Sequence, residues 1–407
     1  MRLTSEEKRM QRGELGEPVR RAIEHQIQVG EFWGAQRMVE VTNAHMMGDI
    51  EVMGQVGLDF LQEASAQQAK TRCPTTTNAR CMDFGWADRF GHTPGAVEKE
   101  REVIATLKRM DVTTVDTCIN YQTVYQPHLG EHVAWGDTGT VIYANSVFGA
   151  RSNFEAGPSA FAAALTGRTP AYGFHLDRHR RGTLRVELAL EPDDLADWGA
   201  IGKLVGEPNQ DYFAVPVFTG VKRTPESDEL KHLGASLASY GSMAMFHMEG
   251  VTPEVSPSDL KLKKRMRITS RDVQTLYSKY SYQKGNTIVV FSGPQLSLWE
   301  LKKLAALFEG RQVHASTRCF ASTSHQVLEE ARALGIAQAL ERAGVGLLEG
   351  MCFYILERLT GIRQDNGWAN LVSNSAKIVN TITAHRFNTV LRRTADCVEI
   401  ACSGKAR

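Results

Sequence analysis

The alternation of strand-like and helix-like segments in the last third of the chain restricts the possible folds most. Short apolar runs there predict strands, and the longer stretches between them carry apolar residues at helical spacing. In chain order, strands are expected at residues 287–291, 313–316 and 346–349, and helices at 296–309 and 326–343. Strands separated by helices pair in parallel, with the helices on the faces of the sheet. This pattern predicts an α/β fold.

The earlier part of the chain continues the same alternation. Helices are expected at residues 6–30, 52–68, 95–110, 160–165, 193–205 and 228–242, and strands at 36–41, 184–190 and 212–218. Within residues 6–30, Pro18 falls where a second helix could begin. The chain has 407 residues, more than the roughly 250–300 at which single cores stop growing. Residues 256–284 are polar and rich in Lys and Arg, which marks a boundary. We therefore expect one or more N-terminal α/β lobes over residues 1–260 and a C-terminal α/β lobe over 285–407.

Composition excludes several classes of protein. The 47 basic and 46 acidic residues nearly cancel, which argues against general nucleic-acid binding because that needs a basic surface. No apolar run approaches the roughly 20 residues needed to span a bilayer, and the first 30 residues lack the apolar core of a secretory signal. Seven cysteines, an odd and scattered set, fit a reducing compartment better than a disulfide framework. These features predict a cytoplasmic protein without a membrane segment.

Residues 116–175 concentrate chemically useful side chains. A thiol (Cys118), an amide next to a hydroxyl (Asn145 and Ser146) and a cation (Arg151) fall in this stretch among glycines at positions 130, 136, 139, 149 and 157. Glycine lets the backbone approach a ligand closely, and polar residues between short apolar runs suit the lining of a binding site. Composition alone leaves open an ordinary run of loops around one buried cysteine.

The sequence motifs in and around this stretch resemble those of the catalytic subunit of the aconitase X family. The resembling words are T-T-T-N-A at residues 75–79, T-C-I-N-Y at 117–121, N-S-V-F-G-A-R-S-N at 145–153, S-N-S-A-K at 373–377 and D-C-V at 396–398. The resemblance implies an aconitase-like, multi-lobed catalytic portion with mostly parallel sheets. It also implies an iron-dependent hydro-lyase, in which a Lewis-acidic iron polarises the leaving hydroxyl and a base removes a proton from the adjacent carbon.

The resemblance implies an iron–sulfur cluster held by cysteines. Cys118 matches the first cluster ligand of the family and Cys352, in G-M-C-F-Y, matches the last. The family's phosphomevalonate branch has a Gly-Cys-Pro-His word where this chain has S-G-P-Q at 292–295, so one thiolate is missing. Cys319, expected at the end of the strand at 313–316, is the candidate replacement, with a role in the core as the alternative, and Cys81 is a weaker candidate. A [2Fe–2S] cluster, a [3Fe–4S] cluster and a mononuclear iron all remain open.

The resemblance also implies substrate-binding positions, carried over residue by residue. Lys377 matches a lysine that faces the anionic end of the substrate, and His45 stands where the family has a small hydroxyl residue. We expect His45, Ser146 and Lys377 to take part in catalysis. The full set expected to contact substrate is Asn43, Ala44, His45, Asn78, Ala79, Arg80, Asn145, Ser146, Arg151, Ser375 and Lys377.

Two other functions compete with this one. His128 and His132, with Asp137 nearby, have the H-x-x-x-H spacing of a zinc site, but Pro127 and Gly130 disfavour the regular helix that such a site needs. A zinc hydrolase is therefore the rival enzyme class. A binding scaffold that has lost its cluster is the rival outside the enzymes.

Substrate and partner follow from the resemblance as well. Known members dehydrate cis-3-hydroxy-L-proline or mevalonate 5-phosphate. The absence of the Gly-Cys-Pro-His motif and the presence of His45 favour a hydroxyproline-like amino acid as the substrate, with the phosphomevalonate reaction as the alternative. The family combines this portion with a small swivelling domain, and no segment of the roughly 100 residues that a domain needs remains beyond the last matching word. We therefore expect a separate small subunit.

Overall fold

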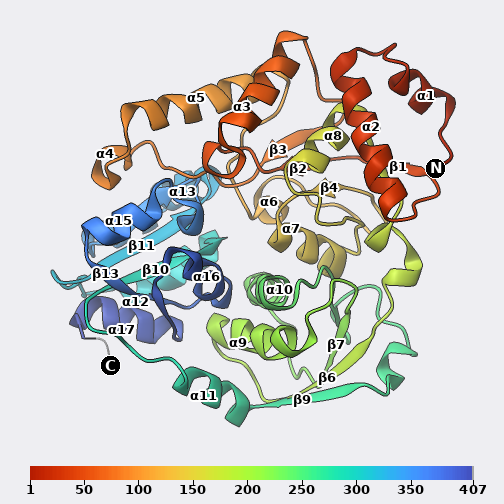
Figure 1. The fold of residues 1–407 in the computed structure, drawn as a ribbon. Coiled ribbons are helices and arrows are strands. Elements are labelled where there is room, and N and C mark those ends of the chain that lie inside the picture. The colour runs from red at the N-terminus through yellow and green to blue at the C-terminus, as the bar shows by residue number, and fades with distance from the viewer. Residues whose placement is uncertain (406–407) are drawn as a thin grey trace.

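The computed structural model describes residues 1–405, which form three lobes around three larger sheets (Figure 1). In Figure 1 the first lobe, red to yellow, lies at the top, the second, green, at the bottom, and the third, cyan to blue, at the left. Strands in the three larger sheets pair in parallel and helices flank them, which confirms the predicted fold class. No helix among these residues is both long and apolar enough to cross a membrane.

The first lobe has a short parallel sheet of order β3-β2-β4 and a separate antiparallel pair, β1 with β5. Its strands are β1 (Met38–Glu40), β2 (Ala44–Met46), β3 (Thr75–Thr77), β4 (Ala134–Trp135) and β5 (Arg168–Pro170). Its helices are α1 (Ser5–Gln11), α2 (Glu17–Phe32), α3 (Ile50–Ala66), α4 (Ala87–Phe90), α5 (Pro94–Arg109), α6 (Asn120–Thr123), α7 (Thr138–Tyr143), the π-helical η1 (Ala144–Phe148), α8 (Pro158–Thr166) and the one-turn η2 (Gly173–His175) and η3 (Asp177–His179). Pro18 lies in the first turn of α2, where its fixed φ suits a helix start.

The second lobe is a four-stranded parallel sheet of order β8-β7-β6-β9. It comprises β6 (Leu184–Ala189), α9 (Leu195–Gly206), η4 (Glu207–Asn209), β7 (Pro216–Thr219), α10 (Ser227–Gly241), β8 (His247–Met248), η5 (Asp259–Lys261), β9 (Arg265–Thr269) and α11 (Ser270–Ser278). Small residues let α9 and α10 pack closely. A Cβ on Gly202 would lie 2.6 Å from the Cβ of Ser236, too close to be accommodated without a shift.

The third lobe is a five-stranded parallel sheet of order β12-β11-β10-β13-β14. It comprises β10 (Asn286–Leu296), α12 (Leu298–Leu307), β11 (Arg318–Thr323), α13 (His325–Ala333), α14 (Ile336–Arg342), β12 (Gly346–Glu349), η6 (Phe353–Ile355), α15 (Leu359–Asp365), β13 (Trp368–Ser373), α16 (Ala376–Thr381), η7 (Ile382–His385), β14 (Asn388–Leu391) and α17 (Thr394–Ser403). The predicted strand–helix alternation is confirmed here, although the helix expected at 326–343 is two helices that meet at Gly335.

One predicted strand is wrong. Residues 313–316 form a loop, and the strand β11 begins two residues later, at Arg318. The backbone N–H of Val313 donates to the carbonyl of Ala343, so this stretch is attached to the end of α14 instead of to β10. The buried strand is the apolar run that follows, in which Cys319 is only the second residue.

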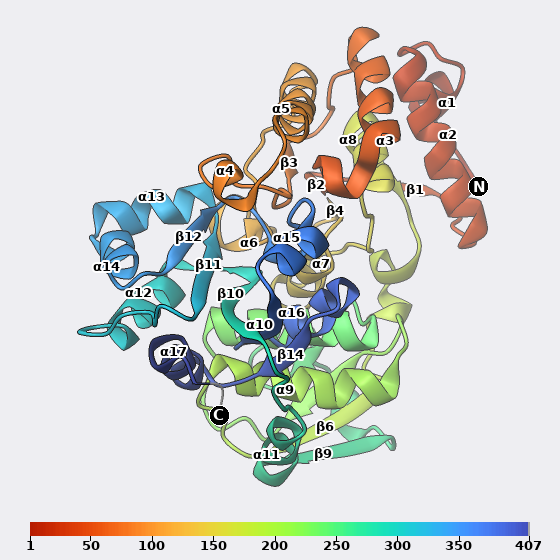
Figure 2. The ribbon, with the colours of Figure 1, turned by 60° about the vertical axis from the view of Figure 1, so that its left-hand side comes forward.

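The carboxyl ends of strands from the first and third lobes meet near the middle of the molecule (Figure 2). Arg80, three residues after β3, pairs with Met351, two residues after β12, as an isolated parallel bridge. The carboxyl edge of a parallel sheet is where ligand sites form in α/β proteins. The loops after β3, β4, β10, β12 and β13 therefore define the region to search for a site.

Candidate active site at Cys118 and Cys352

Two buried thiols lie on facing loops of the first and third lobes. Cys118 comes just before α6, and Cys352 lies three residues beyond β12. Burial, together with a negative charge on the neighbouring Cys352, raises the pKa of Cys118 to about 12. Burial likewise raises the pKa of Cys352 to about 11, against the opposing effect of the Lys377 ammonium. The two thiols share one environment, and a positive group bound between them would favour their ionised forms.

A buried ion pair completes this environment. Lys377 follows the Ser375 cap of α16, and its Nζ lies 3.5 Å from Oδ1 of Asp137. Burial disfavours the charge of Lys377, but Asp137, Tyr354 and the two thiols together raise the pKa of the lysine. Asp137 caps α7, and its Oδ2 accepts from the backbone N–H of Gly139 at 2.8 Å. A Cβ on Gly139 would lie 3.5 Å from the lysine Nζ, so glycine keeps space free beside the ammonium.

His45 adds a neutral imidazole on the same side of the first lobe. Its Nδ1 lies 2.8 Å from Oγ1 of Thr76, whereas its buried Nε2 has no hydrogen-bond partner among residues 1–405. Burial lowers the pKa of His45 to about 4, although Asp137 and Asn78 favour the charged form. Oδ1 of Asn78 is also buried without a partner in the described part of the chain. Because unsatisfied buried polar atoms are costly, His45 and Asn78 are candidates for contact with a ligand.

Arg80 connects the two lobes through both its backbone and its side chain. Its carbonyl accepts from the N–H of Cys352 at 3.1 Å, and its guanidinium forms an ion pair with Asp116 at 3.1 Å. Asp116 lies two residues before Cys118. Ala79 is fully buried beside Arg80, and its side chain is only a methyl group without a polar atom. The predicted pair Ala79 and Arg80 thus borders the thiols.

Other predicted substrate-binding residues use their polar atoms within the protein. The Asn43 amide donates to the carbonyl of Pro74 and accepts from the Trp135 indole, and Asn145 bonds with Ser152 and the Ala244 carbonyl. Oγ of Ser146 accepts from the N–H of Phe246. The structure therefore does not direct these side chains at the thiols.

Three further predicted residues, Ala44, Arg151 and Ser375, also make their contacts within the protein. Ala44 is a fully buried residue of β2 that pairs with Thr75 and Ala134. The Arg151 guanidinium forms an ion pair with Asp177 and is not brought to the thiols. Ser375 donates to the carbonyl of Gly293, which ties the start of α16 to the end of β10.

Cys319 is not brought together with Cys118 and Cys352. It lies at the amino end of β11, paired with Val289, and the carboxyl end of that strand is Thr323. Burial raises the pKa of its thiol, and the neighbouring charge is that of Cys402. Its expected position at the carboxyl edge depended on the strand at 313–316, which does not form. Cys81 is likewise apart, with its thiol 3.7 Å from Glu100.

The residues proposed for a zinc site do not converge. His128 is exposed and pairs with Glu131, the His132 imidazole meets that of His175 at 2.8 Å, and Asp137 caps a helix beside Lys377. Within residues 1–405, no three His, Cys, Asp or Glu side chains form a group that could hold a metal ion by themselves.

Sequence reasoning missed two residues of this region. Asp137 was considered only as a zinc ligand, although an Asp directly before T-G-T after a strand is a typical helix cap that places a carboxylate at the sheet edge. Gln295 is fully buried, and its backbone N–H lies 3.2 Å from Sγ of Cys118. No local sequence signal identifies Gln295, because its partners lie far away along the chain.

Family models cover nearly the whole chain. The aconitase X first, second and third domains match residues 1–178, 182–278 and 286–403, which follow the three lobes. The chain is 32% identical over 379 residues to the phosphomevalonate dehydratase large subunit of Methanothermobacter thermautotrophicus, covering 92% of each chain. It is 30% identical to the cis-3-hydroxy-L-proline dehydratase of Pseudomonas aeruginosa, covering 97% of this chain and 69% of that one.

A solved structure agrees with the sequence matches. The crystal structure of Thermococcus kodakaraensis aconitase X in its holo-form superposes with a TM-score of 0.88 at 28% identity, covering 98% of this chain and all of that one. The expected aconitase-like architecture is confirmed, and the zinc hydrolase alternative is wrong because the named relatives are dehydratases. The chain belongs to the aconitase X family and is a hydro-lyase.

Proposed function

We propose that this chain is the large subunit of an iron-dependent dehydratase whose substrate is cis-3-hydroxy-L-proline or a closely related hydroxy acid. The observation that carries this proposal is the buried Lys377–Asp137 pair beside Cys118 and Cys352. A small amino acid carries a carboxylate and an ammonium on the same carbon. A lysine ammonium and a carboxylate 3.5 Å apart offer one opposite charge to each of these groups.

The donor atoms present fit an iron–sulfur group held by two thiolates. Cys118 and Cys352 would hold it, and the described residues bring no third thiol to them. This favours a two-iron cluster or a mononuclear iron over a cluster held by three thiolates. When bound, such a group supplies a Lewis-acidic iron that polarises the leaving hydroxyl.

The chain's own residues would bind the substrate and accept a proton. Lys377 would bind the substrate carboxylate and Asp137 its ammonium. His45 is neutral near pH 7 because burial lowers its pKa, so Nε2 can accept a proton from the carbon next to the hydroxyl. Burial of all three side chains excludes water and strengthens each charge interaction.

Mevalonate 5-phosphate is the second candidate substrate. The match to the phosphomevalonate dehydratase large subunit spans 92% of both chains, whereas the hydroxyproline dehydratase relative extends well beyond the match. A doubly charged phosphate together with a carboxylate needs more than one free cation. Lys377 is shared with Asp137, and Arg80 is shared with Asp116, which favours the amino acid.

We also propose a separate small subunit. The relatives matched over nearly their full length are named large subunits, and that name implies a smaller partner. This subunit would close over the site and complete the substrate contacts.

Anaerobic reconstitution with iron and sulfide tests the proposal. Protein purified with its co-expressed small partner should show broad visible absorbance and contain iron and sulfide. It should dehydrate cis-3-hydroxy-L-proline faster than mevalonate 5-phosphate. Mass spectrometry of the products measures both rates. A preference for the phosphorylated substrate would establish the second candidate, and a colourless protein without iron would indicate a cluster-less binding scaffold.

A further inference from the structure

Gln295 joins three separate segments around the two thiols. Its side-chain Oε1 accepts from the backbone N–H of Cys118 at 3.1 Å. Its Nε2 lies 3.2–3.3 Å from three backbone carbonyls, those of Asp116, Thr323 and Met351. These carbonyls belong to the Cys118 loop, the end of β11 and the Cys352 loop. One fully buried amide therefore holds both thiol-bearing loops against the third-lobe sheet.

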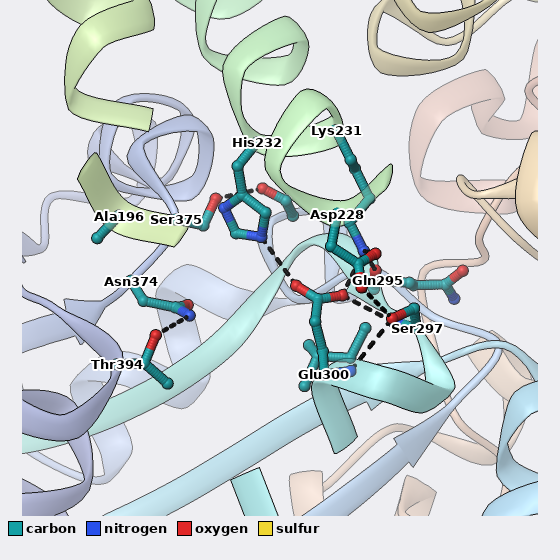
Figure 3. Close-up of polar contacts among 12 residues, drawn as sticks. Ala196, Asp228, Lys231, His232, Gln295, Ser297, Glu300, Asn374, Ser375 and Thr394 are labelled. Atoms are coloured by element: carbon teal, nitrogen blue, oxygen red, sulfur yellow. Dashed lines mark hydrogen bonds and ion pairs between the residues drawn. The ribbon is translucent and has the colours of Figure 1, made fainter. Parts of the chain in front are cut away.

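The backbone of Gln295 is fixed from the opposite side. Its carbonyl accepts from Nζ of Lys231 at 3.2 Å, and Lys231 is held in turn by Asp228 and Glu300. Figure 3 shows this network on one side of Gln295, whose side chain points away from it. The N–H of Gln295 lies 3.2 Å from Sγ of Cys118 and can donate to a thiolate there. Gln295 thus links an ion network between the second and third lobes to the thiol in the first lobe.

The same short segment supports the other thiol. Oγ of Ser292, three residues before Gln295, accepts from the N–H of Phe353 at 3.3 Å and lies 2.6 Å from Oγ of Ser322 on β11. Residues 292–295 therefore form hydrogen bonds with both thiol-bearing loops.

Loss of the Gln295 amide would affect the thiol loops first. Each of its side-chain partners lies within two residues of Cys118 or Cys352, except for the Thr323 carbonyl. A buried donor or acceptor left without its partner costs about 1–3 kcal/mol, and a loop can avoid that cost by moving. Movement of either loop changes the spacing of the two sulfurs.

We propose that Gln295 is a positioning residue that holds Cys118 and Cys352 at the spacing required to bind iron. This inference rests on the proposed iron–sulfur function of the two cysteines. Hydrogen bonds behind metal ligands orient them, and their removal typically costs about 10–100-fold in metal affinity.

Substitution by an isosteric apolar residue tests the proposal. In the anaerobically reconstituted protein with its small partner, Gln295→Met should lose iron to a chelator about 10–100-fold faster than wild type. Its visible absorption band should also shift. Gln26→Met is the matched control, because Gln26 is equally buried and its amide donates to two backbone carbonyls, Ser159 and Arg168, remote from the thiols. This control should lose stability but keep the wild-type iron-release rate and spectrum.

The opposite result would overturn the proposal: wild-type iron release and spectrum in Gln295→Met, or equal changes in Gln26→Met. If Gln295→Met does not fold, Gln295→Asn serves instead, since its shorter amide cannot reach both loops. Hydrogen exchange of the metal-free proteins separates this proposal from the proposed function. If wild type binds no iron, the proposed function fails. Faster exchange of the Cys118 amide in Gln295→Met but not in Gln26→Met still supports positioning, and unchanged exchange refutes it.

Discussion

Two buried lysines, Lys231 and Lys377, differ in how many hydrogen-bond acceptors surround their ammonium groups. Lys231 has three acceptors for its three N–H donors: Asp228 at 3.0 Å, the Gln295 carbonyl at 3.2 Å and Glu300 (Figure 3). Lys377 has one polar contact within the described residues, Asp137 at 3.5 Å. Nearby carboxylates outweigh the effect of burial and raise the pKa of both lysines.

Hydrogen-bond saturation therefore separates the two lysines, whereas burial and charge do not. A saturated ammonium at Lys231 holds α10 to the third lobe and cannot accept a ligand without losing a partner. The unsaturated ammonium of Lys377 has free donors next to two thiols and a glycine that leaves space beside it. This contrast indicates a structural role for Lys231 and supports the proposal that Lys377 binds substrate.

The largest expected effect concerns the thiols beside Lys377. Cys118→Ala and Cys118→Ser should abolish iron retention and dehydratase activity while the fold stays largely intact, because neither side chain replaces a thiolate ligand. Iron content and turnover of the anaerobic protein measure this. Cys319→Ala and Cys397→Ala, at buried cysteines away from the site, should keep their iron. Full iron content and turnover in Cys118→Ala would show that the iron assignment is wrong.

The saturated lysine should matter most for stability. Lys231→Met leaves the carboxylates of Asp228 and Glu300 buried without their cation, so we expect the free energy of unfolding to fall by about 3–5 kcal/mol. Urea denaturation followed by circular dichroism gives this value. A stability loss below that of Lys377→Met would break the proposed contrast between the two lysines.

The unsaturated lysine should matter most for turnover. Lys377→Met should lower kcat/KM by about 10²–10³-fold, the usual cost of removing one positioned charge from a water-excluded site. Its unfolding free energy should change less than that of Lys231→Met, because Asp137 keeps its helix-capping hydrogen bonds. Steady-state kinetics beside the denaturation curves test both points. Normal kinetics in this variant would remove Lys377 from the site.

The smallest effect is expected at two buried carboxyls, Asp49 and Glu100, that form no ion pair within residues 1–405. Burial and the negative charge of Glu100 raise the pKa of Asp49 to about 8. Burial raises the pKa of Glu100 to about 7, against the opposing effect of the Arg80 guanidinium. The folded protein therefore holds extra protons above about pH 4, and stability falls as pH rises through 7–8.

Glu100→Gln tests this sign. Between pH 5 and pH 8, the free energy of unfolding should fall by about 1–3 kcal/mol less in Glu100→Gln than in wild type. The reason is that the neutral amide has no proton to release. Denaturation at three pH values measures the difference, with the exposed Glu98→Gln as control. Parallel pH profiles for Glu100→Gln and wild type would contradict the shifted pKa values.

Much of the fold could be predicted from the chain. The strand–helix alternation predicted the third lobe, and Pro18 correctly indicated the start of α2. The strand predicted at residues 313–316 was wrong because a run of only a few apolar residues shows no periodicity from which the start of a strand can be located. The observed strand starts five residues after the expected start at 313, which moved Cys319 from the carboxyl edge of the sheet to its amino end.

The candidate site was predictable in part. Cys118, Cys352, His45, Asn78 and Lys377 were all named from the words around them, and the structure brings them into one region. Asn43, Asn145 and Ser146 were named with equal justification, yet their polar atoms are engaged within the protein. A sequence motif identifies a residue, but it does not specify which groups its side chain hydrogen-bonds with.

The sequence by itself determined the class of fold and the family and selected Cys118 and Cys352 as candidates, because these depend on local periodicity and on short sequence motifs. Only the tertiary structure decided which charges meet. Asp137 and Lys377 are 240 positions apart, and Gln295 reaches Cys118 across 177. Such contacts form only when separate sheets pack together, and their hydrogen-bond geometry decides whether a buried polar group is fully paired or free to bind a ligand.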